Sequence, residues 1–207
     1  MAKPPAAPRS HPPTPPKPAT KPAAPFTVFL DRDGVLNEAP RIAVWRPHGF
    51  RWLPGVKEAL ARLNRPGIQV CLATNQPHTS TGLLPRGRLH RLHGWMAAEI
   101  HAAGGHLDRI EYAPAFGRRR KPRPGMLESG AAALGADPAR SVMVGDNFKD
   151  ADAALRFGCR AILLATTNSR AKMEAGVKKR GWDVPVVDDL PAAVELILKM
   201  AKAHQHD

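Results

Sequence analysis

Phe26-Thr-Val-Phe-Leu-Asp-Arg-Asp-Gly34 is the stretch on which the prediction of the fold depends. Its first five residues are apolar or β-branched, as in a buried strand, and the run stops at two aspartates and a glycine. Two later apolar runs end in the same way: residues 68–73 stop at Thr74-Asn75, and residues 141–144 stop at Gly145-Asp146. Strands that end in polar residues are typical of a ligand site at the carboxyl edge of a parallel sheet.

Strand and helix patterns alternate along the rest of the chain. Strands are predicted at residues 26–30, 68–73, 109–113, 141–144, 161–165 and 184–187. Helices are predicted at residues 54–64, 86–103, 124–134 and 191–203. One more helix is predicted to run through Ala151 and Leu155 and to end at Gly158. Because the strands are continuous apolar runs, this order predicts a doubly wound α/β fold with a mostly parallel sheet covered on both faces. The short segments between the motifs leave no room for a large cap domain.

The composition divides the chain into a tail, residues 1–25, and one domain, residues 26–204. The tail holds ten of the 22 prolines and four basic residues but no acidic one, so we expect it to be disordered. It lacks the apolar stretch of a secretory signal, and no apolar run approaches the ~20 residues that cross a bilayer. We therefore expect a soluble, cytoplasmic monomer that does not bind membranes.

The net charge indicates which partners the protein can bind, and the two cysteines indicate their own redox state. A net charge of +13 predicts attraction to anions such as phosphorylated metabolites, with nucleic acid as a less favoured partner. The dense run Arg118-Arg119-Arg120-Lys121 would be a solvated loop if it had no function. Cys71 and Cys159 both lie in or beside buried strands, which is typical of reduced thiols packed as small apolar groups.

The strand-end residues together are the groups that phosphoryl transfer needs. If the sheet is doubly wound, Asp31, Asp33, Thr74 and Asp146 meet in one crevice, with Lys121 in the loop beyond the third strand. Carboxylates bind a hard divalent cation, and a hydroxyl and an ammonium stabilise phosphoryl oxygens. The sequence therefore predicts a site for phosphoryl transfer that holds a hard divalent cation.

Four motifs give a resemblance to a known family. They are Asp31-Arg-Asp-Gly-Val-Leu-Asn37, Thr74-Asn-Gln76, Arg120-Lys-Pro-Arg-Pro-Gly-Met126 and Val144-Gly-Asp-Asn-Phe-Lys-Asp150. In this order they resemble the motifs of the haloacid dehalogenase-like phosphatases, above all the branch with the D-glycero-D-manno-heptose 1,7-bisphosphate and histidinol-phosphate phosphatases. The resemblance covers about residues 26 to 200 and implies the Rossmann-like fold of that family. It also implies Mg²⁺ as the cofactor and a small-molecule phosphomonoester as the substrate.

The resemblance also implies a role for each matching residue. Asp31 would be the nucleophile and Asp33 the general acid and base. Mg²⁺ would be held by the Asp31 and Asp146 carboxylates and by the backbone carbonyl of Asp33. Lys121 would neutralise charge on the phosphoryl group, and Asp150 would orient Lys121 or a metal-bound water.

The remaining matches concern the substrate. Thr74 and Asn75 would donate hydrogen bonds to the phosphoryl oxygens, while Gln76, Arg120 and Asn147 would contact the rest of the substrate. Structural alternatives stay open: Thr74-Asn75 as a helix cap, Asp150 as a charge at a helix N-terminus, and Asn147 as a turn residue. The histidines of the second helix, His90, His93 and His101, are expected at the surface rather than at a metal.

The chain departs from its relatives where many of them carry a zinc loop of Cys-x-His and Cys-x-Cys. The corresponding positions are Ala113, Ala115, Gly117 and Arg119, so no zinc is expected and substrate preference does not transfer. The leading hypothesis is a phosphatase of a sugar phosphate such as D-glycero-D-manno-heptose 1,7-bisphosphate. The alternatives are a histidinol-phosphate phosphatase, a nucleic-acid 3′-phosphatase, and a non-catalytic scaffold that binds partners through its proline-rich tail.

Overall fold

One parallel sheet forms the centre of the protein in the computed structural model, which describes residues 24–44, 46–80 and 85–204. Its strands, in chain order, are β1 (Phe26–Leu30), β2 (Ile68–Asn75), β3 (Arg109–Ala113), β4 (Ser141–Gly145), β5 (Arg160–Leu164) and β6 (Val186–Val187). Their order across the sheet is β3-β2-β1-β4-β5-β6, and every neighbouring pair is parallel. The predicted doubly wound α/β fold is thereby confirmed.

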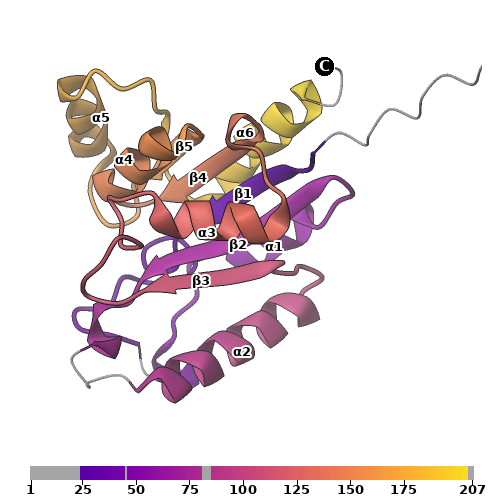
Figure 1. The fold of residues 1–207 in the computed structure, drawn as a ribbon, viewed down its shortest axis with the longest axis vertical. Helices are drawn as coiled ribbons and strands as arrows, with labels where there is room; N and C mark the ends of the chain where they lie inside the picture. The colour runs from indigo at the N-terminus through magenta and orange to yellow at the C-terminus, as the bar shows by residue number, and fades with distance from the viewer. Residues whose placement is uncertain (1–23, 45, 81–84, 205–207) are drawn as a thin grey trace, which may run out of the picture.

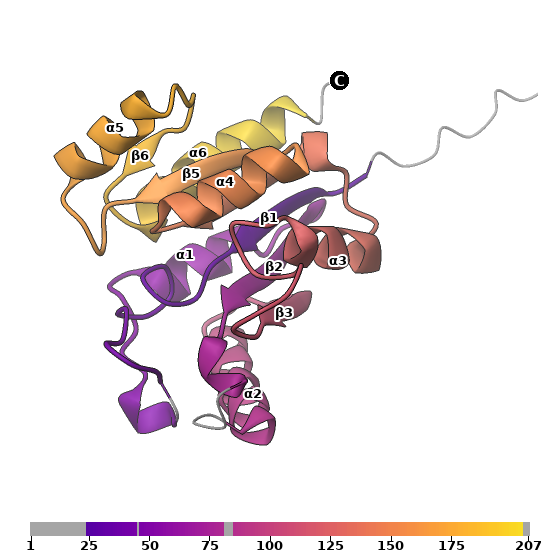
Figure 2. The same ribbon diagram turned by 60° about the vertical axis from the view of Figure 1, so that its left-hand side comes forward.

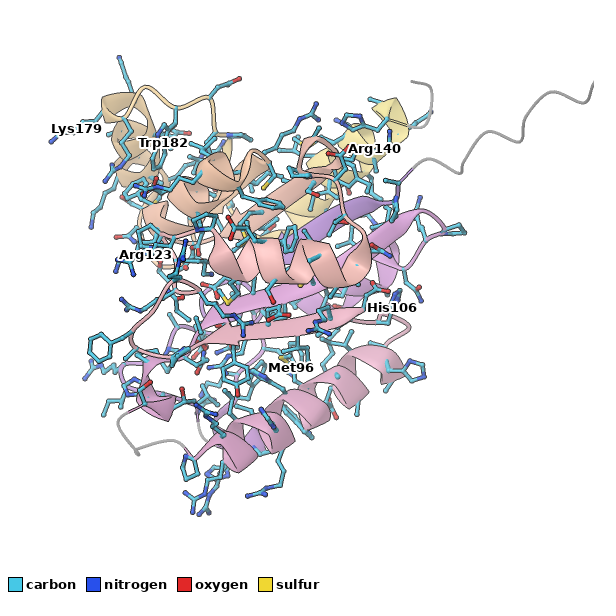
Figure 3. The ribbon with its side chains drawn as sticks, in the orientation of Figure 1. Met96, His106, Arg123, Arg140, Lys179 and Trp182 are labelled. Carbon is cyan, nitrogen blue, oxygen red and sulfur yellow. The ribbon has the colours of Figure 1, made fainter. Side chains whose placement is uncertain are left out.

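The helices cover both faces of this sheet (Figures 1 and 2). They are α1 (Val56–Leu63), α2 (Arg86–Ala102), α3 (Gly125–Leu134), α4 (Phe148–Phe157), α5 (Arg170–Lys179) and α6 (Leu190–Ala203), with short 3₁₀ turns η1 (Pro47–Gly49), η2 (Pro77–Thr79) and η3 (Pro138–Arg140). Successive strand residues point to opposite faces, so Val28 packs in one core with α1, α2 and α6, whereas Phe29 packs in another with α3, α4 and α5. Figure 3 shows Met96 of α2 between its helix and the sheet.

The strand order places the switch point of the fold between β1 and β4. The chain runs outward from β1 through β2 to β3, and then returns to the other side of β1 with β4. Loops leave the sheet in opposite directions there, which opens a crevice at the carboxyl ends of the two strands. Asp31 and Asp146 directly follow these two strands, so the fold puts both at the crevice.

Among the helices of the described residues, α5 is the one that the sequence patterns missed. Eight of its ten residues, RAKMEAGVKK, are charged or small, so its apolar pattern is weak. Only Met173 and Val177 are buried, one turn apart, and the Ser169 side chain caps the helix by accepting from the Lys172 N–H. Serine before an i, i+4 apolar pair is the signal that could have found it.

Two further expectations concern the ends of the chain. The predicted strand at residues 184–187 is shorter, since β6 comprises Val186–Val187 alone. Nearly all of the predicted disordered tail, residues 1–23, lies outside the described residues. Over the part of the chain that is described, no helix is both long enough and apolar enough to cross a membrane.

Candidate active site

The loop after β1 brings two carboxylates to the crevice. The Asp31 side chain accepts a hydrogen bond from the Arg32 backbone N–H at 2.8 Å. Gly34 then turns the chain with a φ of 81°, and a Cβ at this position would lie 2.3 Å from Oδ2 of Asp146. A side chain here would therefore be strained and would clash, so glycine lets the β1 and β4 loops touch.

Lys121 lies between the carboxylates, although it comes from a loop some 90 residues away. Its Nζ atom lies 3.1 Å from Oδ2 of Asp31 and 2.6 Å from Oδ1 of Asp150, and it donates to the Ala73 carbonyl at 2.7 Å. The Asn75 amide fixes this loop by donating to the Lys121 carbonyl and accepting from the Lys121 N–H. The side chain of Asn75 thus holds Lys121 in place as well as lining the cleft.

The start of α4 supplies Asp146 and Asp150. Asn147 is the N-cap residue: its side chain accepts from the Lys149 N–H, and Oδ2 of Asp150 accepts from the Asn147 N–H. The other oxygen of Asp150 binds Lys121, so this aspartate both completes the cap and orients the lysine. Asn147 and Asp150 thus both have the structural role at the helix start that was left open as an alternative. Both also lie beside the other site residues.

The electrostatics of the crevice are set by burial and by like charges. Burial raises the pKa of Asp31 to about 6, opposed by Lys121 and reinforced by Asp150 and Asp33. Burial also raises the pKa of Asp146 to about 6, and the charge of Asp31 adds to the rise. Burial alone would lower the pKa of Lys121, but the Asp150 and Asp31 carboxylates outweigh it and raise that pKa. One ammonium therefore faces three carboxylates at short range.

This donor set fits a hard divalent cation. One carboxylate oxygen each from Asp31, Asp146 and Asp150 lies within 4.8 Å of the others, and within the described residues no other group of three His, Cys, Asp or Glu side chains is as close. Mg²⁺ prefers such oxygen ligands and would balance their excess negative charge. Asp150 accepts from Lys121 and from the Asn147 N–H, and Asp31 accepts from Lys121 and from the Arg32 N–H, so both share the lysine, whereas Asp146 accepts from Thr167 on one oxygen.

Asp33 is held by a ring of nitrogen donors. Arg32 donates to both of its carboxylate oxygens, and the amides of Asn37 and Gln76 each donate to one of them at 3.0 Å. Gln76 also donates to the Thr74 hydroxyl at 3.2 Å. The carboxylate is therefore fixed in position. Arg32 and Asn37 were not singled out from the sequence, although both lie inside the quoted motif.

His93 corrects the expectation that the histidines of α2 are surface residues. It is buried, with Nε2 3.4 Å from Nη1 of Arg32, and Arg32 is itself fully buried. Burial, helped by the Arg32 charge, lowers the pKa of His93 to about 3. The neutral ring therefore packs against the guanidinium that holds Asp33. The contact spans 61 residues of sequence, which is why a local pattern could not predict it.

The low pKa of His93 predicts an acid-sensitive fold. The unfolded chain binds a proton here below about pH 6.5, whereas the folded protein does so only near pH 3, so acidification in this window favours unfolding. Between pH 7 and pH 5 we expect the unfolding free energy of the wild type to fall by about 2 kcal/mol relative to that of H93Q. Urea titrations at both pH values measure the difference. H101Q, at an exposed position of α2, is the control, and a wild-type pH dependence in H93Q would contradict this assignment.

The cleft above these groups has a volume of about 260 Å³. The predicted site residues that line it are Asp31, Asp33, Asn75, Gln76, Asp146, Asn147 and Asp150. Arg120 instead lines a neighbouring hollow together with Lys121 and Arg123. Figure 3 places Arg123 at the carboxyl edge of the sheet and Arg140 at the opposite edge. Contact between Arg120 and the substrate stays a prediction.

The positions that correspond to the zinc loop of relatives lie at the end of β3 and just beyond it. Ala113 is the last residue of β3, and Arg119 forms an ion pair with the buried Glu111 of the same strand. Glu111 also accepts from Arg109 and Ser129. An ion-pair cluster thus ties this loop, which leads to Arg120 and Lys121, to the sheet.

Comparisons with known proteins agree with this fold. A family model described as "HAD-hyrolase-like" matches residues 118–193. The D-glycero-D-manno-heptose-1,7-bisphosphate 7-phosphatase of Thermosynechococcus vestitus is 35% identical over 185 residues, which cover 82% of this chain and 94% of the relative. The D-glycero-beta-D-manno-heptose-1,7-bisphosphate 7-phosphatase of Bordetella bronchiseptica is also 35% identical, over 84% of this chain and 98% of the relative.

A solved structure extends the comparison to three dimensions. The D,D-heptose 1,7-bisphosphate phosphatase from B. bronchiseptica, complexed with magnesium and phosphate, matches with a TM-score of 0.75 and 34% identity. The match covers 84% of this chain and 98% of that one. The likeness therefore extends over most of this chain.

Proposed function

Because this chain belongs to the haloacid dehalogenase-like hydrolases, in the branch of the heptose bisphosphate phosphatases, we propose that it is a Mg²⁺-dependent sugar-phosphate phosphatase that works through an aspartyl-phosphate. Family membership makes it a phosphoric monoester hydrolase. The proposed substrate is D-glycero-D-manno-heptose 1,7-bisphosphate. The observation that carries the proposal is that Asp31 and Asp146 line one cleft with Asp33, and that the Lys121 ammonium lies 3.1 Å from Asp31.

In the first proposed step, a carboxylate oxygen of Asp31 attacks the phosphorus and the bond to the sugar oxygen breaks. Asp33, protonated for this step, gives its proton to the leaving alkoxide. Lys121, which is held by Asp150 and lies beside Asp31, would neutralise charge on the equatorial oxygens, and the Thr74 hydroxyl would donate to one of them. The products of this step are a free sugar hydroxyl and phosphate bound covalently to Asp31.

In the second step, Asp33 takes a proton from a water that attacks the same phosphorus. The bond to Asp31 breaks, inorganic phosphate leaves, and Asp33 is again protonated for the next substrate. Arg32, Asn37 and Gln76 keep Asp33 in place through both steps. Mg²⁺, held by the Asp31 and Asp146 carboxylates and the Asp33 carbonyl, would supply charge stabilisation and alignment of the phosphoryl group.

A bisphosphate carries a second anionic end, and Lys149 is a suitable partner for it. Lys149 lies in the first turn of α4 and lines the cleft beyond Asn147. Among the described residues it has no carboxylate within ion-pair distance, whereas Arg156 on the same helix is paired with Asp152. An unpaired ammonium at the wall of a cleft whose floor holds carboxylates can select substrates by their distal charge.

K149A is therefore expected to raise KM for the heptose bisphosphate about five- to tenfold, the effect of losing one partly exposed charge-assisted contact. KM for a sugar monophosphate and kcat for both substrates should change little. Steady-state phosphate release with Mg²⁺ measures all four constants, and K178A on the exposed side of α5 is the control. Equal effects on both substrates would exclude a role for Lys149 in recognising the second phosphate.

A substrate panel tests the proposed function as a whole. Phosphate release with Mg²⁺ is measured over the heptose bisphosphate, histidinol phosphate and a 3′-phosphorylated oligonucleotide. The proposal predicts the highest kcat/KM for the bisphosphate. A preference for the oligonucleotide that is lost steeply with added salt would instead support nucleic acid as the substrate. Equal activity across the panel would contradict the assignment to heptose.

A further inference from the structure

Two threonines after β5 bind the two loops that meet at the crevice. The Thr166 hydroxyl donates to the backbone carbonyl of Gly34, in the loop after β1. The Thr167 hydroxyl donates to Oδ2 of Asp146, in the loop after β4, at 2.7 Å. Neither residue belongs to the four motifs, and neither has a role in the steps above. Adjacent residues of a third strand loop are therefore attached to both loops that carry the proposed Mg²⁺ ligands.

The threonines are attached at the point where the loops after β1 and β4 touch each other. Gly34 leaves no room for a side chain against Asp146, so backbone and carboxylate are in direct contact there. A carboxylate on a short side chain can still rotate about its last bond, and a rotation would change which oxygen faces Asp31. Because the Thr167 hydroxyl binds Oδ2, it fixes that rotation.

The loop that carries the threonines is itself anchored at both ends. The Ala165 N–H, just after β5, donates to the Val187 carbonyl of β6. Two residues after Thr167, Ser169 begins α5 as its N-cap. With its ends fixed and Thr166 bound to Gly34, the loop has little freedom to move Thr167 away from Asp146. The hydroxyl is thus presented to the carboxylate by the fold.

We propose that Thr167 is a positioning residue that orients the Asp146 carboxylate for Mg²⁺, with Thr166 holding its loop against the nucleophile loop. The inference rests on the proposed function, since it assumes that Asp146 is a ligand of the cation. Groups that bind a metal ligand without touching the metal commonly change metal affinity 10- to 100-fold when removed. Thr167 is exposed on its outer side, so its effect should lie at the lower end of this range.

The experiment compares Mg²⁺ binding in T167V and T167S. Valine has the shape of threonine without the hydroxyl, and serine keeps the hydroxyl. T27V is the control, because Thr27 is buried in β1 and its hydroxyl has no hydrogen-bond partner. Isothermal titration of the full chain with Mg²⁺ alone gives the dissociation constant, and the thermal midpoint with and without Mg²⁺ gives a second readout. Since Thr167 is exposed, valine should not disturb folding, and T167C, with its weaker thiol donor, is a second variant.

The proposal predicts a roughly tenfold weaker Mg²⁺ affinity and a smaller Mg²⁺-induced rise in thermal midpoint for T167V. T167S and T27V should bind Mg²⁺ like the wild type. In turnover assays T167V should need more Mg²⁺ for half-maximal rate but reach nearly the wild-type kcat at saturation. Wild-type Mg²⁺ affinity in T167V would overturn the role of Thr167 and leave the proposed function intact. Absence of Mg²⁺ binding in the wild type would overturn both.

Discussion

Asp31→Asn is expected to lower kcat by at least about 10³-fold, the largest effect of any single change considered for this protein. The amide nitrogen and oxygen of asparagine cannot serve as the phosphoryl acceptor in the first step, and no other carboxylate is placed to replace Asp31. Asp150 is occupied by Lys121 and the Asn147 N–H, and Asp33 is held by Arg32, Asn37 and Gln76. Phosphate release under saturating Mg²⁺ measures the loss.

The same change should leave the fold at least as stable as before. Burial raises the pKa of Asp31, so its charged form is held at a cost, and the neutral amide removes repulsion from Asp150 and Asp33. The thermal midpoint of D31N should therefore equal or exceed that of the wild type. D188N, at an exposed aspartate, controls for the loss of a negative charge. A D31N protein as active as D188N would show that Asp31 is not the nucleophile.

Lys121→Met is expected to lower both activity and stability. The side chain is 1% exposed, and its ammonium is the counter-charge of Asp31 and Asp150. Removing one partner of a buried ion pair costs about 3–5 kcal/mol, because the remaining charge is left without compensation. Loss of a preorganised charge at the transferring phosphoryl group should lower kcat on the order of 10²- to 10³-fold. Urea unfolding and steady-state kinetics measure the two effects separately.

The double variant K121M/D150N separates the structural role of Lys121 from the catalytic one. Asparagine at position 150 removes one of the two carboxylates left without a counter-charge and keeps an acceptor for the Asn147 N–H, so part of the lost stability should return. Activity should not return, because the ammonium is still missing from the phosphoryl site. K178M, on the surface of α5, is the control for the substitution itself. Recovery of activity together with stability would mean that Lys121 only supports the fold.

Much of the site followed from the rule that parallel strands end at one edge. Asp31, Thr74 and Asp146 were predicted to converge because each follows an apolar run. The strand order brings Asp31 and Asp146 to the β1–β4 switch point, and Thr74, on β2, is linked to Asp33 through the Gln76 amide. Lys121 was placed in the loop beyond the third strand, and its role at the phosphoryl group depended on the family resemblance. Its position between Asp31 and Asp150 comes from the Asn75 amide and the Ala73 carbonyl of β2.

Other features depend on contacts that no local pattern contains. An arginine between two aspartates looks like an exposed loop residue, yet Arg32 is fully buried because Asp33 and His93 surround its guanidinium. Thr167 comes shortly after strand β5, but a Thr-Thr-Asn-Ser run resembles an ordinary polar loop. Its partner Asp146 lies 21 residues away, directly after the neighbouring strand β4. Such side-chain partners are decided by the tertiary structure.

The central claim is that the Asp31 carboxylate receives the phosphoryl group, and chemical trapping tests it most directly. Asp33→Asn should slow the second step, since no base activates the water, while an aryl phosphate with a good leaving group needs no proton in the first. Acid quenching of D33N after mixing with this substrate and Mg²⁺, followed by peptide mass spectrometry, locates the phosphate. The account predicts phosphate on the peptide that contains Asp31, and none in D31N/D33N. Phosphate on another residue, or on none while the phenol is released, would contradict it.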